Sequence, residues 1–326
     1  MTDTAGKAEL SFADFFATEI APGLPELEEA RKDRVRAAYT RAFGTAFVVA
    51  IAAVIAWFME QPVVAAVLLA AGLGFGFFWV LSPSRRHRKA VRDFFIPPLL
   101  RFLGDVDYHR EPGQHFEVER FRRSGILPAV DKAKVALEDL LVGRYRDTDY
   151  RLVEARLRSK NRSKNKTASK LIFAGLLCDI SVPQPFSGRV LLVDEPEGTE
   201  AKTPLGQRDS AAGLSPVALD HPGFEKRYQV FSDSPRAARG LLQPALLDSL
   251  LAIADDLDVA AVRCGFFEGR FLIALPQHRN LFEIGRLHRS LEHAEDDLRR
   301  LALEFTIPHR LIDNLHGERK PLVPES

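Results

Sequence analysis

Two long apolar runs decide the fold of this chain. Residues 42–59 read AFGTAFVVAIAAVIAWFM and residues 63–81 read VVAAVLLAAGLGFGFFWVL, with only EQP between them. Neither run contains a charged residue. Each is long enough, as a helix rising about 1.5 Å per residue, to cross a hydrocarbon core of roughly 30 Å. The sequence therefore predicts a two-helix transmembrane hairpin at residues 42–82.

Basic residues on both sides of this hairpin predict its orientation. Such clusters are retained on the cytoplasmic side of a membrane, so we expect both termini inside and the tip at residues 60–62 outside. The same side chains can contact anionic lipid headgroups. Nothing aromatic or groove-shaped accompanies them, which argues against nucleic acid as a partner. The residues concerned are Arg31, Lys32, Arg34, Arg36, Arg41, Arg85, Arg86, Arg88, Lys89 and Arg92.

Small residues recur one turn apart in both runs. Gly72 and Gly76 form a GxxxG pattern in the second run, and Ala46 and Ala50 share that spacing in the first. Small side chains let helix backbones approach closely in lipid. The pattern fits packing of the two spans on each other, and it equally leaves open a homodimer. A segment of 41 residues, rich in charged side chains, precedes the first run, which argues against a cleavable signal peptide.

The rest of the chain divides around the hairpin. We expect a cytoplasmic helical segment at residues 1–41, broken at APGLP, and a juxtamembrane helix within residues 83–104 that ends at Pro97. Residues 105–326 should form a cytoplasmic α+β domain, a mostly antiparallel sheet with packed helices. The net charge of +1 excludes a strongly polyanionic or polycationic protein.

Periodicity predicts the elements of this domain. Residues 150–158, 171–180, 186–195 and 224–232 have the pattern of strands, and residues 259–276 that of a hairpin turning at Glu268 and Gly269. The first two strands should enclose a long basic loop at residues 158–170, open to lipid, nucleic acid or solvent. Helices are expected at residues 128–143, after Ser234, after Pro244 and at residues 287–305, the last packing on the sheet.

No catalytic constellation is visible in the sequence. It contains no HExxH, GxSxG or P-loop pattern, and Cys178 and Cys264 each lie in an apolar strand. We predict no cofactor, and an enzymatic role stays uncertain. Asp255, Asp256 and Asp258 gather at a helix C-terminus, where the helix dipole disfavours them. A divalent cation, a neighbouring arginine or solvent exposure could compensate these carboxylates.

Several segments resemble a known family. They read ALEDLLVG, LIFAGLLCDISVPQPFSGRVLLV, FEKRYQVFSDSPRAARGLLQPALLDSLL and GFFEGRFLIALP. Together with the preceding hairpin, they are similar to DUF3137, a family of bacterial membrane proteins of unknown function. Gly240 departs from the family pattern, which is commonly aromatic there. The resemblance implies location in the bacterial inner membrane and supplies no activity or catalytic residues.

Two functions from different classes remain open. The chain can be a membrane-anchored adaptor that binds a protein partner at the membrane, with a second copy of itself as one such partner. Alternatively, it is an enzyme or small-ligand sensor whose site is assembled from residues distant in the sequence. A pocket with convergent polar groups would favour the second.

Overall fold

The computed structural model describes residues 12–58, 62–104, 106–113, 115–128, 134–163, 166–182, 186, 188–194, 211, 213–256, 262–276, 287 and 289–316. The chain divides into two compact units. The first combines the described residues from Phe12 to Phe102 with those from Leu287 to Leu301. The second contains those from Leu103 to Pro276 and from Ala302 to His316.

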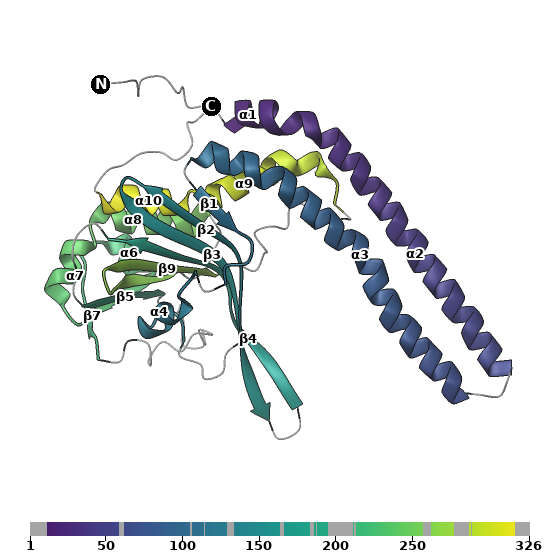
Figure 1. Ribbon diagram of the computed structural model, residues 1–326. Coiled ribbons are helices and arrows are strands. Elements are labelled where there is room, and N and C mark those ends of the chain that lie inside the picture. The colour runs from purple at the N-terminus through teal and green to yellow at the C-terminus, as the bar shows by residue number, and fades with distance from the viewer. Residues whose placement is uncertain are drawn as a thin grey trace. The chain divides into compact units, whose positions relative to one another are not determined.

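Two long helices, α2 (Leu24–Phe58) and α3 (Pro62–Leu103), dominate the first unit and run antiparallel side by side (Figure 1). The Phe15 ring, just ahead of them, stacks on Phe102 with centroids 4.6 Å apart. A Cβ built on Gly23 would lie 2.5 Å from the Phe94 ring, so only a glycine allows this close approach. The two predicted apolar runs are therefore helical, and the described contacts join the segments at the far ends of the two helices.

The segment before α2 breaks where the sequence predicts. A short helix α1 (Phe12–Phe15) is followed by a π-helical turn η1 (Phe16–Ile20) and a 3-10 turn η2 (Ala21–Gly23). Pro22 lacks a backbone N–H, which disfavours a regular helix at this point. The chain then enters α2 without a further break up to Phe58.

The expected end of the juxtamembrane helix at Pro97 is wrong, because α3 continues through both prolines to Leu103. A proline inside a helix removes one backbone hydrogen bond. Phe95, Ile96 and Leu99 are buried on either side of the prolines. Burial of these apolar side chains favours continuation of the helix past the lost bond.

The C-terminal apolar stripe also lies in this first unit. It comprises the 3-10 turn η3 (Leu291–His293) and the start of α9 (Ala294–Phe305). Arg31 donates to the Leu287 carbonyl at 2.8 Å, and the Leu291 N–H donates to Glu28 at 3.3 Å. The expectation that residues 287–305 pack on the sheet is therefore wrong for residues 287–301, because backbone groups there bond to α2.

The second unit is built on a nine-stranded, fully antiparallel sheet with strand order β1-β2-β3-β4-β9-β8-β5-β7-β6. The strands are β1 (Val106–His109), β2 (Lys134–Tyr145), β3 (Thr148–Ser163), β4 (Lys166–Ser181), β5 (Arg189–Asp194), β6 (Ser215–Pro216), β7 (Tyr228–Ser232), β8 (Arg263–Phe267) and β9 (Arg270–Pro276). The α+β class and the antiparallel sheet are confirmed.

Apolar layers form on both faces of the sheet because side chains alternate along each strand. One face, including Val153, Ala155 and Leu157, packs with the segment that contains helix α4 (Val118–Arg123). Helix α10 (Ile307–Leu315) contacts β3, β4 and helix α8 (Pro244–Asp256). The small helices α6 (Pro222–Glu225) and α7 (Pro235–Leu241) contact β7.

Residues 134–143 form strand β2, so the predicted helix there is wrong. A bulge between Glu138 and Leu141 places Asp139 at φ 56° and lets both Leu140 and Leu141 be buried. That irregularity disturbs the alternation by which a strand is recognised in sequence. Pairing with β1 and β3 on both sides then outweighs local helical spacing.

The prediction of a long basic loop is also wrong, because β3 and β4 continue through most of residues 158–170. Ser163 pairs with Lys166, which leaves only residues 164–165 between the strands. Beyond Arg158 and Gly175 the neighbouring strands no longer pair with this hairpin. It continues as a two-stranded ribbon past the sheet (Figure 1). The side chains of residues 160–169 lie outside the described ones.

Candidate functional site

The surface of α2 exposes large apolar side chains in its second half. Their exposed fractions range from 44% at Ile51 to 81% at Phe58. The others in this stretch are Phe43, Phe47, Val48, Val54 and Ile55. The helical stretch Phe12–Ala56 is long and apolar enough to cross a membrane, and 6% of its most apolar window is buried. We call these seven residues the α2 apolar surface.

The basic residues next to this surface fall into two groups. Lys32, Arg36, Arg86, Arg88 and Lys89 are exposed, and Arg36 lies 3.7 Å from the equally exposed Asp33. By contrast, Arg31 is 12% exposed and binds Glu28 at 2.7 Å as well as the Leu287 carbonyl. Arg31 therefore holds the first unit together.

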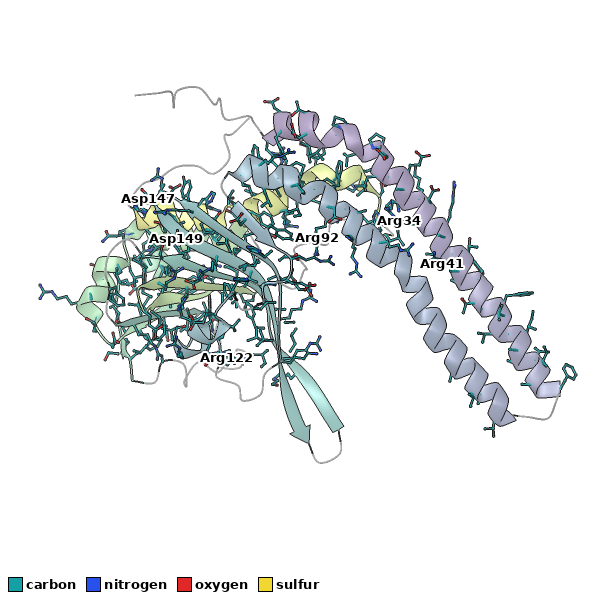
Figure 2. The ribbon with its side chains drawn as sticks, in the orientation of Figure 1. Arg34, Arg41, Arg92, Arg122, Asp147 and Asp149 are labelled. Atoms are coloured by element: carbon teal, nitrogen blue, oxygen red, sulfur yellow. The ribbon has the colours of Figure 1, made fainter. Side chains whose placement is uncertain are left out.

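Three further cations, Arg34, Arg41 and Arg92, lie on the same two helices (Figure 2). Arg34 faces His87 across the pair, with 3.3 Å between Nη1 and Nδ1. Burial, followed by the charges of Arg34 and Arg31, lowers the pKa of His87 to about 4. His87 is therefore neutral at physiological pH and adds no charge to the basic cluster. The side chain of Arg85, and the packing of Gly72 and Gly76 within α3, lie outside what the structure describes.

The acidic cluster at the end of α8 is divided between two arginines. Asp255 accepts from Arg227 at 2.6 Å, and Asp256 accepts from Arg310. Asp258 lies outside the described residues. The described part of the chain contains no group of three histidine, cysteine or acidic side chains placed to hold a metal ion. Arginine thus compensates the two carboxylates that the structure describes, as one of the sequence alternatives expected.

The two cysteines are buried in β4 and β8. Burial raises the pKa of Cys264 and, with the neighbouring Asp179, that of Cys178. Because a thiolate is the reactive form, both are poor nucleophiles. They act as small core residues, as the apolar context of each predicts.

A hollow of about 400 Å³ lies at the β1 edge of the sheet. His109, at the end of β1, and His115 and Glu117, ahead of α4, line it together with Val142 and Arg151 from the paired strands β2 and β3. The two imidazole rings stack with centroids 5.7 Å apart at an interplanar angle of 20°. We call this feature the β1-edge hollow.

Sequence reasoning did not identify this hollow. His109 and His115 show no motif spacing, and Arg151 is an ordinary alternating residue of a strand. Pairing sets β1 beside β2 and Val142 opposite Arg151, and the segment ahead of α4 adds His115 to the same hollow.

Beside the hollow, α4 carries a network of charged side chains. Arg120 donates to the buried Asp179 at 2.7 Å and to Glu117 at 2.7 Å. Arg270 also donates to Asp179. Arg123 bridges Glu117 at 3.2 Å and Glu268 at 2.6 Å. This network ties α4 to the β4–β9 part of the sheet.

A comparison with protein families finds a match that includes most of the sheet unit. The family model of DUF3137, described as a protein of unknown function, matches residues 171–316. These residues resemble DUF3137. The match contains β4 through α10, and thus FEKRYQVFSDSPRAARGLLQPALLDSLL, the most specific part of the resemblance. DUF3137 supplies no activity, and the β1-edge hollow lies ahead of the matched residues.

Among solved structures, the chain is similar to the crystal structure of the mycobacterial trehalose monomycolate transport factor A, TtfA. The two share 13% identity with a TM-score of 0.32, over 73% of this chain and 96% of the other. No curated protein matches the chain.

Proposed function

We propose that this chain is an adaptor anchored in the bacterial inner membrane. In this proposal α2 and α3 span the bilayer as a hairpin, both termini are cytoplasmic, and the sheet unit binds a protein partner at the membrane. The proposal includes a homodimer through the hairpin as one form of that partnership. The proposal does not include nucleic acid as a partner.

The α2 apolar surface is the observation that carries the anchor. Each exposed Phe, Ile or Val side chain would contribute about 1.5–3 kcal/mol if it were moved from water to an apolar surrounding. Seven such side chains on one helix form a larger exposed apolar surface than monomeric soluble proteins normally carry. Lipid provides that surrounding without a second protein surface.

The charges on the helices support the orientation. The exposed cations Lys32, Arg36, Arg86, Arg88 and Lys89 all lie on the side of the apolar stretch away from residues 59–61. A cytoplasmic location of these cations follows the bias of membrane proteins toward positive cytoplasmic loops. The sheet unit follows α3 in the chain and would lie on the same side.

Alkaline carbonate extraction of membranes tests the anchor. The full chain should stay in the membrane pellet, whereas Ile51→Asp with Ile55→Asp should move it substantially to the supernatant. An aspartate at the centre of a spanning helix costs about 2.5–3.5 kcal/mol. Lys32→Asp with Arg36→Asp, on the polar part of the same helix, is the matched control and should stay in the pellet. Complete extraction of the unaltered chain would overturn the anchor.

The partner is tested by crosslinking in cells with the full-length protein, followed by gentle detergent extraction and mass spectrometry. We expect one recurrent, near-stoichiometric partner that disappears when residues 105–326 are deleted while the hairpin still reaches the membrane. The same partner recovered with the hairpin alone would place binding outside the sheet unit and contradict the adaptor proposal.

A further inference from the structure

The β1-edge hollow contains a cation that the protein does not neutralise. Arg151 is half-buried in the wall of the hollow. Within the described part of the chain its guanidinium makes no hydrogen bond or ion pair. Two arginines of the α4 network beside the hollow, Arg120 and Arg123, are both bound to carboxylates. Arg151 is thus a half-buried positive charge that lines an open space.

Two further hydrogen-bond donors line the same space. Among the described residues, neither His109 nor His115 has a hydrogen-bond partner for its imidazole. Every tautomer of an imidazole retains at least one N–H that can donate. Arg151 and the two histidines therefore offer the hollow a guanidinium and two ring N–H groups.

Glu117 is the acidic group among the described residues that line the hollow, and it is already engaged. Its carboxylate accepts from Arg120 at 2.7 Å and from Arg123 at 3.2 Å. These two arginines offset its charge from the α4 side. Among the described lining residues Arg151 is then the charge without an opposite partner, which favours an anion in the hollow.

The arrangement fits an oxyanion better than a metal ion. Nearly parallel, stacked imidazoles direct their in-plane nitrogen lone pairs along parallel planes, so they do not converge on one ion. A guanidinium with two separate imidazole donors matches the three terminal oxygens of a phosphate group better than the two of a carboxylate. The volume of about 400 Å³ is within the range of small-molecule sites.

We propose that the β1-edge hollow binds the phosphate group of a small phosphomonoester, with Arg151, His109 and His115 as its donors. The phosphate can belong to a soluble metabolite or to the monoester headgroup of a lipid, and the chemistry of recognition is the same. The phosphate site does not depend on the membrane anchor or on a protein partner. The site proposal and the adaptor proposal can therefore be contradicted independently of each other.

Calorimetric titration of the full chain in a phosphate-free, nonionic maltoside detergent tests the proposal. The probes are inorganic phosphate, glycerol 3-phosphate and mixed micelles containing phosphatidic acid, with glycerol and maltoside micelles as blanks. We expect saturable binding of at least one phosphate probe. Arg151→Gln should weaken it at least about tenfold, which is about 1.4 kcal/mol, and His115→Ala should weaken it less.

Arg236→Gln is the matched control, because Arg236 is an exposed arginine on α7 and does not line the hollow. It should bind like the unaltered protein. Circular dichroism must show the same thermal transition for the Arg151 variant and the control. Binding of the soluble probes identifies a metabolite, and binding of phosphatidic acid alone identifies a lipid headgroup. Saturable binding of none of the probes, or equal binding by the Arg151 and Arg236 variants, would overturn the site.

Discussion

Asp179 is the residue that connects helix α4 to the sheet. Its side chain is 2% exposed, and it accepts hydrogen bonds from Arg120 of α4 and Arg270 of β9. Two guanidinium groups next to one buried carboxylate satisfy it fully. Removing Asp179 leaves Arg270 without this carboxylate and Arg120 with Glu117 as its other partner, and losing one member of a buried charged group costs more than the intact arrangement contributes.

We expect Asp179→Ala to lower the free energy of unfolding by about 3–5 kcal/mol. The matched control is Glu119→Ala, because Glu119 pairs with Arg122 on the same helix but is 61% exposed. That change should stay within about 0.5 kcal/mol. Chemical denaturation of the full chain in detergent, followed by circular dichroism, measures both. Similar values for the two variants would show that burial of the network does not matter.

Two glycines in the sheet unit make a second residue-scale contrast. A Cβ at Gly265 in β8 would lie 2.0 Å from the Val190 carbonyl oxygen of β5, whereas one at Gly240 in α7 would meet nothing within 4 Å. Gly265→Ala should therefore separate the two strands and destabilise by more than about 3 kcal/mol. Gly240→Ala should be neutral or stabilise α7 by up to about 1 kcal/mol. Thermal unfolding measures both changes. A Gly265 variant with the same melting temperature as the unaltered chain would contradict the first expectation.

At the scale of the element, strand β3 contains a buried acidic residue. Glu154 is 4% exposed, and its carboxylate lies 3.1 Å from the partly exposed Arg156. Burial raises the pKa of Glu154 to about 7, and Arg156 only partly opposes this effect. The folded state therefore binds the proton more tightly than the unfolded chain. The contribution of Glu154 to stability is highest in acid and falls as pH rises from about 4.5 to about 7.

Glu154→Gln should remove this dependence. The variant should be more stable than the unaltered chain at pH 8 by on the order of 2 kcal/mol, since each pKa unit corresponds to about 1.4 kcal/mol. At pH 5 the two should be similar. Comparing the two proteins cancels the titration of all other groups. Hydrogen exchange of the β3 amides across this pH range gives the measurement, and a difference independent of pH would contradict it.

At the scale of the whole molecule, the proposed topology places both ends of the chain on one side of the membrane. A reporter active only in the periplasm should work when inserted next to Gln61 and should be inactive when fused after Ser326. The bias of basic residues toward the cytoplasmic side predicts this order. Activity at Ser326 alone would reverse the orientation, and activity at neither position would contradict a span that emerges between α2 and α3.

Charge reversal provides a control for that experiment. Replacing Arg86, Arg88 and Lys89 by glutamate removes three exposed cations after the second apolar run. The proposed topology predicts increased periplasmic activity at Ser326 in this variant, because positive residues near the span ends set the orientation. Unchanged reporter activities would mean that other parts of the chain determine the orientation.

The sequence by itself determined the features that depend on composition and local period. It predicted the two apolar helices, the break at APGLP, the buried cysteines and the turn at Glu268 and Gly269, where both residues have positive φ. It also predicted an antiparallel α+β unit and the resemblance to DUF3137. The helices, the break, the burial of the cysteines and the turn arise from residues within a few positions of one another, so the local order of apolar, polar and turn residues is sufficient to predict them.

Only the tertiary structure decided where distant segments meet. Strand β2 forms because β1 and β3 pair with it around a bulge at Asp139, against its helical spacing. Residues 287–301 lie with α2 because Arg31 and Glu28 bond to their backbone. The β1-edge hollow combines the paired strands β1, β2 and β3 with the segment ahead of α4, so His109, His115 and Arg151 line it together. Strand register and long-range hydrogen bonds are properties of two segments together, so neither segment's sequence contains them.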